Sequence, residues 1–177
     1  MSIYLQSSVT DIYKAALGVS ATAAALLELR PATSARTPSE VEDQNRAAVS
    51  ASFDAWRAGA GSPFDLLADD ARWTIEGNSV ASKTYPTKEA LMREVIWPFN
   101  ARMKSSLKPT VRALCADGDT VVIFFDARAM ALDDRPYVNT YAWFFGMRGG
   151  RVIRASAFFD AIEFNDLWSR VLPAPAN

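Results

Sequence analysis

Four strand-like segments in the C-terminal half of the chain are joined by turns too short for a crossover, and this feature constrains the fold most. The turns are rich in glycine and aspartate, residues that favour tight turns. Strands joined by such short connections pair antiparallel with their neighbours. The sequence therefore predicts an antiparallel meander, with strands at about residues 107–116, 120–131, 136–146 and 151–160.

Helical patterns surround this meander. Ser39 and Glu42 have the spacing of a capping box at the start of a first helix, and Thr87 can cap a later helix that Pro98 ends or kinks. A short second helix, a strand at 72–76 and a terminal helix at 164–171 complete the order α-α-β-α-β-β-β-β-α. This order predicts an α+β fold in which helices pack in the concave face of a curved, mostly antiparallel sheet.

Composition limits the chemistry. The 177 residues suit one domain, half of them are hydrophobic and the formal net charge is -1. The chain has no histidine and one cysteine, which excludes Ser-His-Asp and Cys-His catalysis and histidine-ligated zinc. Proton transfer must use Asp, Glu, Tyr, Lys or water. The near-neutral charge and the lack of a long apolar run predict no nucleic-acid and no membrane partner.

Residues 1–36 differ from the rest and are expected to form an N-terminal extension, while 37–177 form the domain. Lys14 precedes an Ala-rich apolar stretch at 15–27, and small residues follow at 32–35. This pattern is typical of a secretory leader; the alternative is a loosely docked helix. The expected location is therefore the cytoplasm, or the periplasm or exterior if 1–35 are a leader.

Two aspartates interrupt apolar strands and are the catalytic candidates. Asp126 follows Val121–Phe125 and shares a strand face with Phe124. If that face is interior, the pKa of Asp126 should rise, which suits a general base; alternatively the strand reaches solvent and Asp126 pairs with Arg128. Asp160 follows Phe158-Phe159, and the alternative role for it is the N-cap of the last helix.

The strand 137–145 carries the best candidate ligand wall. Its odd positions place aromatic rings and the amide of Asn139 on one face, a combination of apolar area and few polar atoms that suits a small-molecule pocket. An ordinary aromatic core, in which Asn139 bonds backbone, is the alternative. The candidate substrate-binding residues are Trp73, Glu76, Asn78, Tyr85, Arg128, Asn139, Tyr141, Trp143 and Phe158.

The segment Val121–Phe125 is apolar on both strand faces. One face can meet the helices, and the other also needs cover. This pattern predicts a homodimer through the outer face of the sheet.

The element order resembles the NTF2-like superfamily, and its SnoaL-like and ketosteroid-isomerase-like branch is the most similar. The resemblance rests on the strand entry at 69–73, the loop at 85–91, the strand at 139–143, and Gly150 leading to Phe158-Phe159-Asp160. It implies a conical fold with one apolar cavity, frequent dimers, and chemistry without a metal or other cofactor. Ile75 or Glu76 falls where ketosteroid isomerases have their base, and Ala142 or Trp143 near their donor aspartate, so their mechanism is not expected here.

Limonene-epoxide hydrolases, also NTF2-like, are similar at two positions. Asp126 and Asp160 fall where that family carries the two aspartates of an Asp-Arg-Asp set. Phe124 falls at the place of its arginine, and Arg128 on the same strand face is the nearest substitute. SnoaL-type cyclases, by resemblance, need a single acidic residue.

Three functions follow as hypotheses. The first is a cofactor-independent isomerase, cyclase or hydrolase that acts on an apolar, oxygenated molecule, with Asp126 or Asp160 as the base and Asn139 and Tyr141 orienting the substrate. The second is a non-catalytic module that binds a small apolar molecule. The third is an association domain that binds another chain through its sheet.

Overall fold

The structure, a computed structural model, describes residues 37–175; the predicted leader or docked helix at 1–36 lies outside this range. The helical elements are α3 (Pro38–Ala58), the 3-10 turn η1 (Pro63–Leu66), α4 (Lys88–Leu91), the π-helical η2 (Met92–Ile96), α5 (Trp97–Asn100) and α6 (Ala161–Arg170). The strands are β1 (Leu67–Ile75), β2 (Thr84–Tyr85), β3 (Lys108–Asp117), β4 (Thr120–Met130), β5 (Pro136–Arg148) and β6 (Arg151–Phe159). None of the described helices is both long enough and apolar enough to span a membrane.

The strands form one mixed sheet in the order β2-β1-β6-β5-β4-β3. Strands β3 to β6 pair antiparallel in sequence order, which confirms the predicted meander and the α+β class. Strand β1 pairs parallel with β6, because the long helical connection after β1 lets the chain return from the other side of the sheet. The two-residue β2, which pairs antiparallel with β1, was not predicted.

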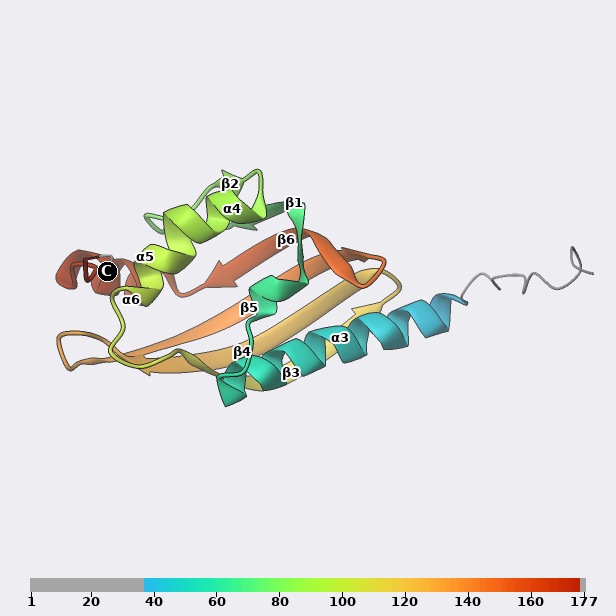
Figure 1. Ribbon diagram of the computed structural model, residues 1–177, viewed down its shortest axis with the longest axis horizontal. Coiled ribbons are helices and arrows are strands. Elements are labelled where there is room, and N and C mark those ends of the chain that lie inside the picture. Colours follow the sequence, from blue (N-terminus) through green and yellow to red (C-terminus); the bar gives the residue numbers. More distant parts are fainter. Residues whose placement is uncertain (1–36, 176–177) are drawn as a thin grey trace, which may run out of the picture. The chain divides into compact units, whose positions relative to one another are not determined.

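Helix α3 begins two residues before the predicted capping box. Thr37 is the N-cap, and Glu40 completes the reciprocal box with it. Pro38 explains the shift, because its fixed φ and missing N–H suit the first helical position. The buried Val49 and Phe53 on the inner face of α3 pack against the sheet, and α3 lies along β3 and β4 (Figure 1).

The segment α4–η2–α5 crosses the sheet near β1 and β2 (Figure 1). The Thr87 hydroxyl accepts from the Ala90 amide, which confirms the predicted cap. Pro98 has no N–H to continue the helical ladder, and the turn before it widens into the π-helical η2. The helix therefore persists through the proline to Asn100 instead of ending there.

Burial along β4 shows which face of the sheet is interior. Val121, Ile123 and Phe125 are fully buried, whereas Phe124 and Asp126 lie on the opposite, half-exposed face. The interior face meets α3: Phe53 contacts Phe125 edge-on with ring centroids 4.9 Å apart. The odd positions of β4 and β5 thus form the core, and the even positions form the outer face.

Candidate functional site

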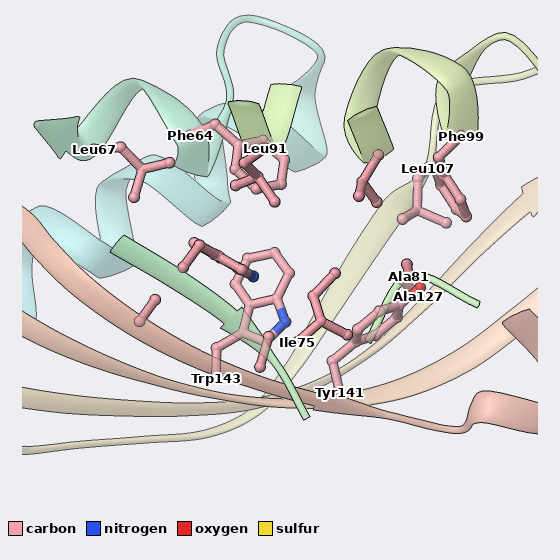
Figure 2. Packing of buried hydrophobic residues seen from close by; sticks show 14 of the residues in the cluster. Phe64, Leu67, Ile75, Ala81, Leu91, Phe99, Leu107, Ala127, Tyr141 and Trp143 are labelled. Atoms are coloured by element: carbon pink, nitrogen blue, oxygen red, sulfur yellow. The ribbon is translucent and has the colours of Figure 1, made fainter. Parts of the chain in front are cut away.

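A cavity of about 570 Å³ lies between the inner face of the sheet and the helical elements η1, α4, η2 and α5. This volume is within the range of small-molecule sites. Figure 2 shows Phe64, Leu91, Phe99 and Leu107 facing Trp143, Ile75 and Tyr141 across this interior. The walls are therefore aromatic and aliphatic, and the strand at 137–145 contributes Tyr141 and Trp143 to them.

Strand register explains the space beside Trp143. Tyr141 and Trp143 point to the same side because they are two residues apart on β5. On β6, Phe159 is the partner of Tyr141 and Ala157 is the partner of Trp143. The small Ala157 leaves room next to the indole, while Phe159 closes the cavity farther along; both line it.

Trp143 carries an unpaired polar atom. Its indole contacts Trp73 and Phe125 edge-on, with ring centroids 5.1 Å and 4.9 Å apart. The Nε1 atom is buried and has no hydrogen-bond partner in the described part of the chain. Aromatic faces offer such an N–H only a weak contact, and an unpaired buried donor costs about 1–3 kcal/mol. Trp143 therefore keeps one buried donor unpaired within residues 37–175.

Tyr141 is the second polar group of the aromatic wall. Its hydroxyl lies 2.9 Å from that of Tyr137, and Tyr137 also accepts from Asn139 Nδ2 at 2.9 Å. Within residues 37–175, the buried Tyr137 proton has no acceptor other than the Tyr141 oxygen. We therefore assign that proton to the Tyr141 oxygen, which leaves the Tyr141 proton free for a group in the cavity.

Burial keeps these phenols neutral. Desolvation raises the pKa of Tyr137 to about 12, opposed by its hydrogen bonds with Tyr141 and Asn139. Burial, followed by the interaction with Tyr137, raises the pKa of Tyr141 well above its usual value. At neutral pH both groups are protonated, so Tyr141 is a hydrogen-bond donor and a poor general base.

Most of the polar residues of the cavity lie on the α5–β3 side. On that side are Asn100, Lys104, Ser105 and Ser106, beside Trp97, which is 55% exposed. Ser62, at the start of η1, also lines the cavity. Lys104 forms an ion pair with Asp134. No three His, Cys, Asp or Glu side chains among residues 37–175 gather as metal ligands would, and the described cavity walls contain no carboxylate.

Of the predicted substrate-binding residues, Trp73, Tyr141 and Trp143 line the cavity. Asn139 is also interior, at 3% exposure, but it has a structural role. Its amide donates to Tyr137 and to the Asp160 carbonyl, and its Oδ1 accepts from the amides of Thr140 and Asp160. All of its hydrogen-bonding capacity is used within the fold, which is the alternative that the sequence left open.

The prediction that Asp126 faces the interior is wrong. Its side chain lies on the outer face of β4, where it is 43% exposed. The carboxylate accepts from Thr140 Oγ1 at 2.8 Å and lies 3.5 Å from Arg112 Nη1. The expected ion pair is therefore formed with Arg112 of β3 instead of Arg128.

Asp160 is also outside the cavity. It is the N-cap of α6, and its exposed carboxylate accepts from the amides of Ile162 at 2.8 Å and Glu163 at 3.5 Å. The helix begins immediately after Asp160, and the amides of its first turn have no partner within the helix. They therefore donate to the Asp160 carboxylate. The two aspartates do not meet around a common ligand position.

The other five candidates also lie away from the cavity lining. Tyr85 is buried, and its hydroxyl donates to the Ala81 carbonyl at 2.7 Å. Glu76 and Asn78 lie in the turn after β1, where Asn78 is exposed. Arg128 and Phe158 are on the outer face of the sheet, and Phe158 is 48% exposed.

Sequence reasoning missed much of the cavity wall. Phe158 was a predicted substrate-binding residue, but its neighbour Phe159 is the one that faces inward. Phe159 is the register partner of Tyr141, so the two side chains lie on the same face of the sheet. The helical side contributes Trp56, Phe64, Leu91, Val95, Phe99 and Phe164. Helical spacing identifies such residues as buried, but it cannot separate those that fill the core from those that border a hollow.

Many solved structures are similar to this chain, and three of them serve as examples. The first is a putative SnoaL-like polyketide cyclase from Jannaschia. It has 18% identity and a TM-score of 0.58, and the match covers 80% of this chain and 99% of that one. Bal32a, from a soil-derived mobile gene cassette, has 18% identity and a TM-score of 0.59, covering 72% and 98%. An NTF2-like protein from Burkholderia pseudomallei has 18% identity and a TM-score of 0.58, covering 70% and 96%. At these identities the likeness establishes the fold.

The family follows from the sequence itself. No curated protein matches the chain. The model of the SnoaL-like domain matches residues 49–155, from the middle of α3 to β6, which is more than half of the 177 residues. This chain therefore belongs to the SnoaL-like domain family.

Proposed function

We propose that this SnoaL-like domain binds a small, mostly apolar molecule that carries a hydrogen-bond acceptor, and holds it without proton transfer by a carboxylate. The observation that carries the proposal is the buried Nε1 of Trp143, which has no hydrogen-bond partner among the described residues. Trp143 lines a hollow of about 570 Å³. Nε1 itself is covered by its neighbours, so the indole would have to turn slightly for a ligand oxygen to pair it. The aromatic walls would supply the affinity.

Tyr141 adds a second donor. With the Tyr137 proton assigned to the Tyr141 oxygen, the Tyr141 proton points to an acceptor outside the Tyr137–Asn139 network. A carbonyl oxygen has two lone pairs and can accept from two donors. A ketone or quinone on an aromatic or alicyclic ring therefore fits these walls better than a hydrocarbon or an amine.

The absence of an acid from the described cavity walls favours binding over acid–base catalysis. Asp126 and Asp160, the bases of the enzyme hypothesis, are bound to Thr140 and to the start of α6 instead. Tyr141 is held protonated by burial. The groups that remain can orient and polarise a carbonyl, but they do not accept a proton at neutral pH.

One observation favours an enzyme as a second candidate. The Asn139–Tyr137–Tyr141 chain of hydrogen bonds ends on a neutral phenol, the kind of donor that stabilises an oxyanion. A substrate that carried its own basic group could then isomerise or cyclise with Tyr141 as the electrophilic donor. An enzyme would convert the bound molecule into a new product, whereas a binding module would release the ligand unchanged.

A matched pair of ligands tests the proposal. 1-Tetralone and tetralin have nearly the same shape, but only tetralone has a carbonyl. We expect calorimetry to show tetralone binding about three- to tenfold more tightly, the worth of one hydrogen bond. Trp143→Phe and Tyr141→Phe should each reduce that preference, and mass spectrometry should recover unchanged tetralone.

Tyr85→Phe is the matched control, because it removes a buried hydroxyl that bonds Ala81 outside the cavity lining. It should leave the preference intact. Equal affinity for tetralone and tetralin in the unmodified protein would refute the donor role, and conversion of a bound ketone would favour the enzyme.

A further inference from the structure

Two arginines lie side by side on the outer face of the sheet. Arg72 of β1 is the direct register partner of Arg154 of β6, and both side chains are exposed. Like charges directly opposite one another destabilise a strand pair. Neither guanidinium has a hydrogen bond or ion pair with any residue of 37–175. Residues 37–175 therefore provide no counter-charge for this pair.

A hollow of about 280 Å³ lies at the same place. Both arginines line it, together with Thr74, Thr120 and Ser156. The floor is formed by strands, so it is fixed by the sheet ladder and not by a loop. Cations and hydroxyl groups here surround one space on a rigid surface.

Gly146 determines where Arg154 lies. It is the β5 partner of Arg154, and a Cβ at position 146 would come within 2.3 Å of Arg154 Nε and 2.6 Å of its Cγ. The arginine therefore lies across the glycine and along the sheet. Any larger residue at 146 would force the Arg154 side chain to shift from this position.

We propose that this hollow binds a small oxyanion, the phosphate or carboxylate group of a small molecule, between Arg72 and Arg154. Each planar guanidinium fork matches two oxygens of such a group, and the hydroxyls of Thr74 and Ser156 can complete its shell. The ligand would remove the repulsion between the two arginines. This site lies on the face opposite the cavity and does not depend on the function proposed for it.

The test uses the full ¹⁵N-labelled chain. Inorganic phosphate and benzoate are titrated separately against chloride at constant ionic strength, while the arginine Nε–Hε signals are followed by NMR. We expect saturable shifts confined to Arg72 and Arg154. Tighter phosphate binding would identify a phosphate site, and tighter benzoate binding would identify a carboxylate site.

Arg154→Gln and Gly146→Ala should each weaken binding at least about tenfold, the first by removing the fork and the second by displacing it. Arg128→Gln is the control, because Arg128 is an exposed arginine of the same sheet face without a partner within 37–175 and outside the hollow. If Arg154→Gln does not fold, Arg154→Lys keeps the charge without the fork and should still weaken binding.

Three results would overturn the proposal. The first is no saturable shift with either anion, and the second is an equal loss in Arg128→Gln. The third is a dimer that dissociates in the Arg72→Gln variant, while phosphate and benzoate do not change its dissociation. That result would mean that an acidic side chain of a second copy occupies the hollow.

Discussion

The Asn139 side chain binds both the backbone amide and the backbone carbonyl of Asp160. Nδ2 donates to the Asp160 carbonyl at 3.0 Å, and Oδ1 accepts from the Asp160 amide at 2.9 Å. The amide thereby fixes the point at which β6 ends and α6 begins. Both residues were candidates for catalysis or binding, and their relationship is structural.

Removal of this amide should destabilise the fold. Asn139→Leu leaves the amides of Thr140 and Asp160 without an acceptor and removes the donor to Tyr137. We expect the free energy of unfolding to fall by about 2–4 kcal/mol, measured by urea denaturation. Asn78→Leu, at an exposed position, should stay within about 0.5 kcal/mol; a similar loss in both variants would contradict the role of the Asn139 network.

The cap on α6 gives a second prediction. Asp160→Ala removes the acceptor for the Ile162 amide and should lower the free energy of unfolding by about 1 kcal/mol. Asp160→Asn retains a capping oxygen and should be nearly neutral. Thermal denaturation separates the two, and equal losses would show that the carboxylate charge, rather than the cap, is what stabilises the helix.

The same aspartates provide a test of the cavity assignment. Because both carboxylates lie outside the cavity lining, Asp126→Asn and Asp160→Asn should leave the affinity for tetralone unchanged within about twofold. Calorimetry with each variant measures this directly. A tenfold loss in either variant would place a carboxylate in contact with the ligand and revive the acid–base hypothesis.

The fold was readable from the sequence because its signals are local. Short turns require antiparallel pairing, and the periodicity of β4 and β5 separates two faces correctly. Alternation shows which residues share a face, however, and not which face is interior. Val121–Phe125 is apolar at odd and even positions alike, so alternation groups Asp126 with Phe124 without showing that their face is the outer one.

The cavity depends on contacts that no local pattern contains. The space beside Trp143 exists because β5–β6 register places Ala157 opposite it, and Phe159 rather than Phe158 faces inward for the same reason. A shift of one residue would exchange these roles. The aromatic wall at 141 and 143 was predictable, since period-two alternation groups those rings whatever the register.

Buried tyrosines should make the protein sensitive to alkali. In the unfolded chain tyrosines ionise near pH 10, whereas Tyr137 keeps its proton until about pH 12. Above pH 10 the unfolded state therefore binds fewer protons than the native state, so the free energy of unfolding falls as pH rises from about 10 to about 12.

Urea denaturation at pH 9, 10 and 11 measures this slope. Tyr137→Phe should be less stable than the unmodified protein at pH 9, because Tyr141 loses its partner, but its stability should fall less steeply above pH 10. The difference in slope should approach about 1.4 kcal/mol per pH unit for one proton. Parallel pH profiles would show that Tyr137 ionises normally in the folded state.

The outer face of the sheet predicts a homodimer. Phe144 and Phe158 form an edge-to-face pair there with ring centroids 6.0 Å apart, and they remain 42% and 48% exposed. Val138 on the same face is 47% exposed. Such an apolar surface on a sheet is typical of an interface, and a two-fold axis would pair it with itself.

Light scattering after gel filtration should thus give twice the chain mass. Phe158→Ser should weaken the dimer about tenfold or more, the effect expected when an aromatic residue at the centre of an interface is removed. Ile162→Ser is the matched control, because Ile162 is 79% exposed on α6 and not on the sheet. If Ile162→Ser dissociates the dimer and Phe158→Ser does not, the interface lies over α6. A monomer at high concentration would mean that the exposed phenylalanines serve another partner.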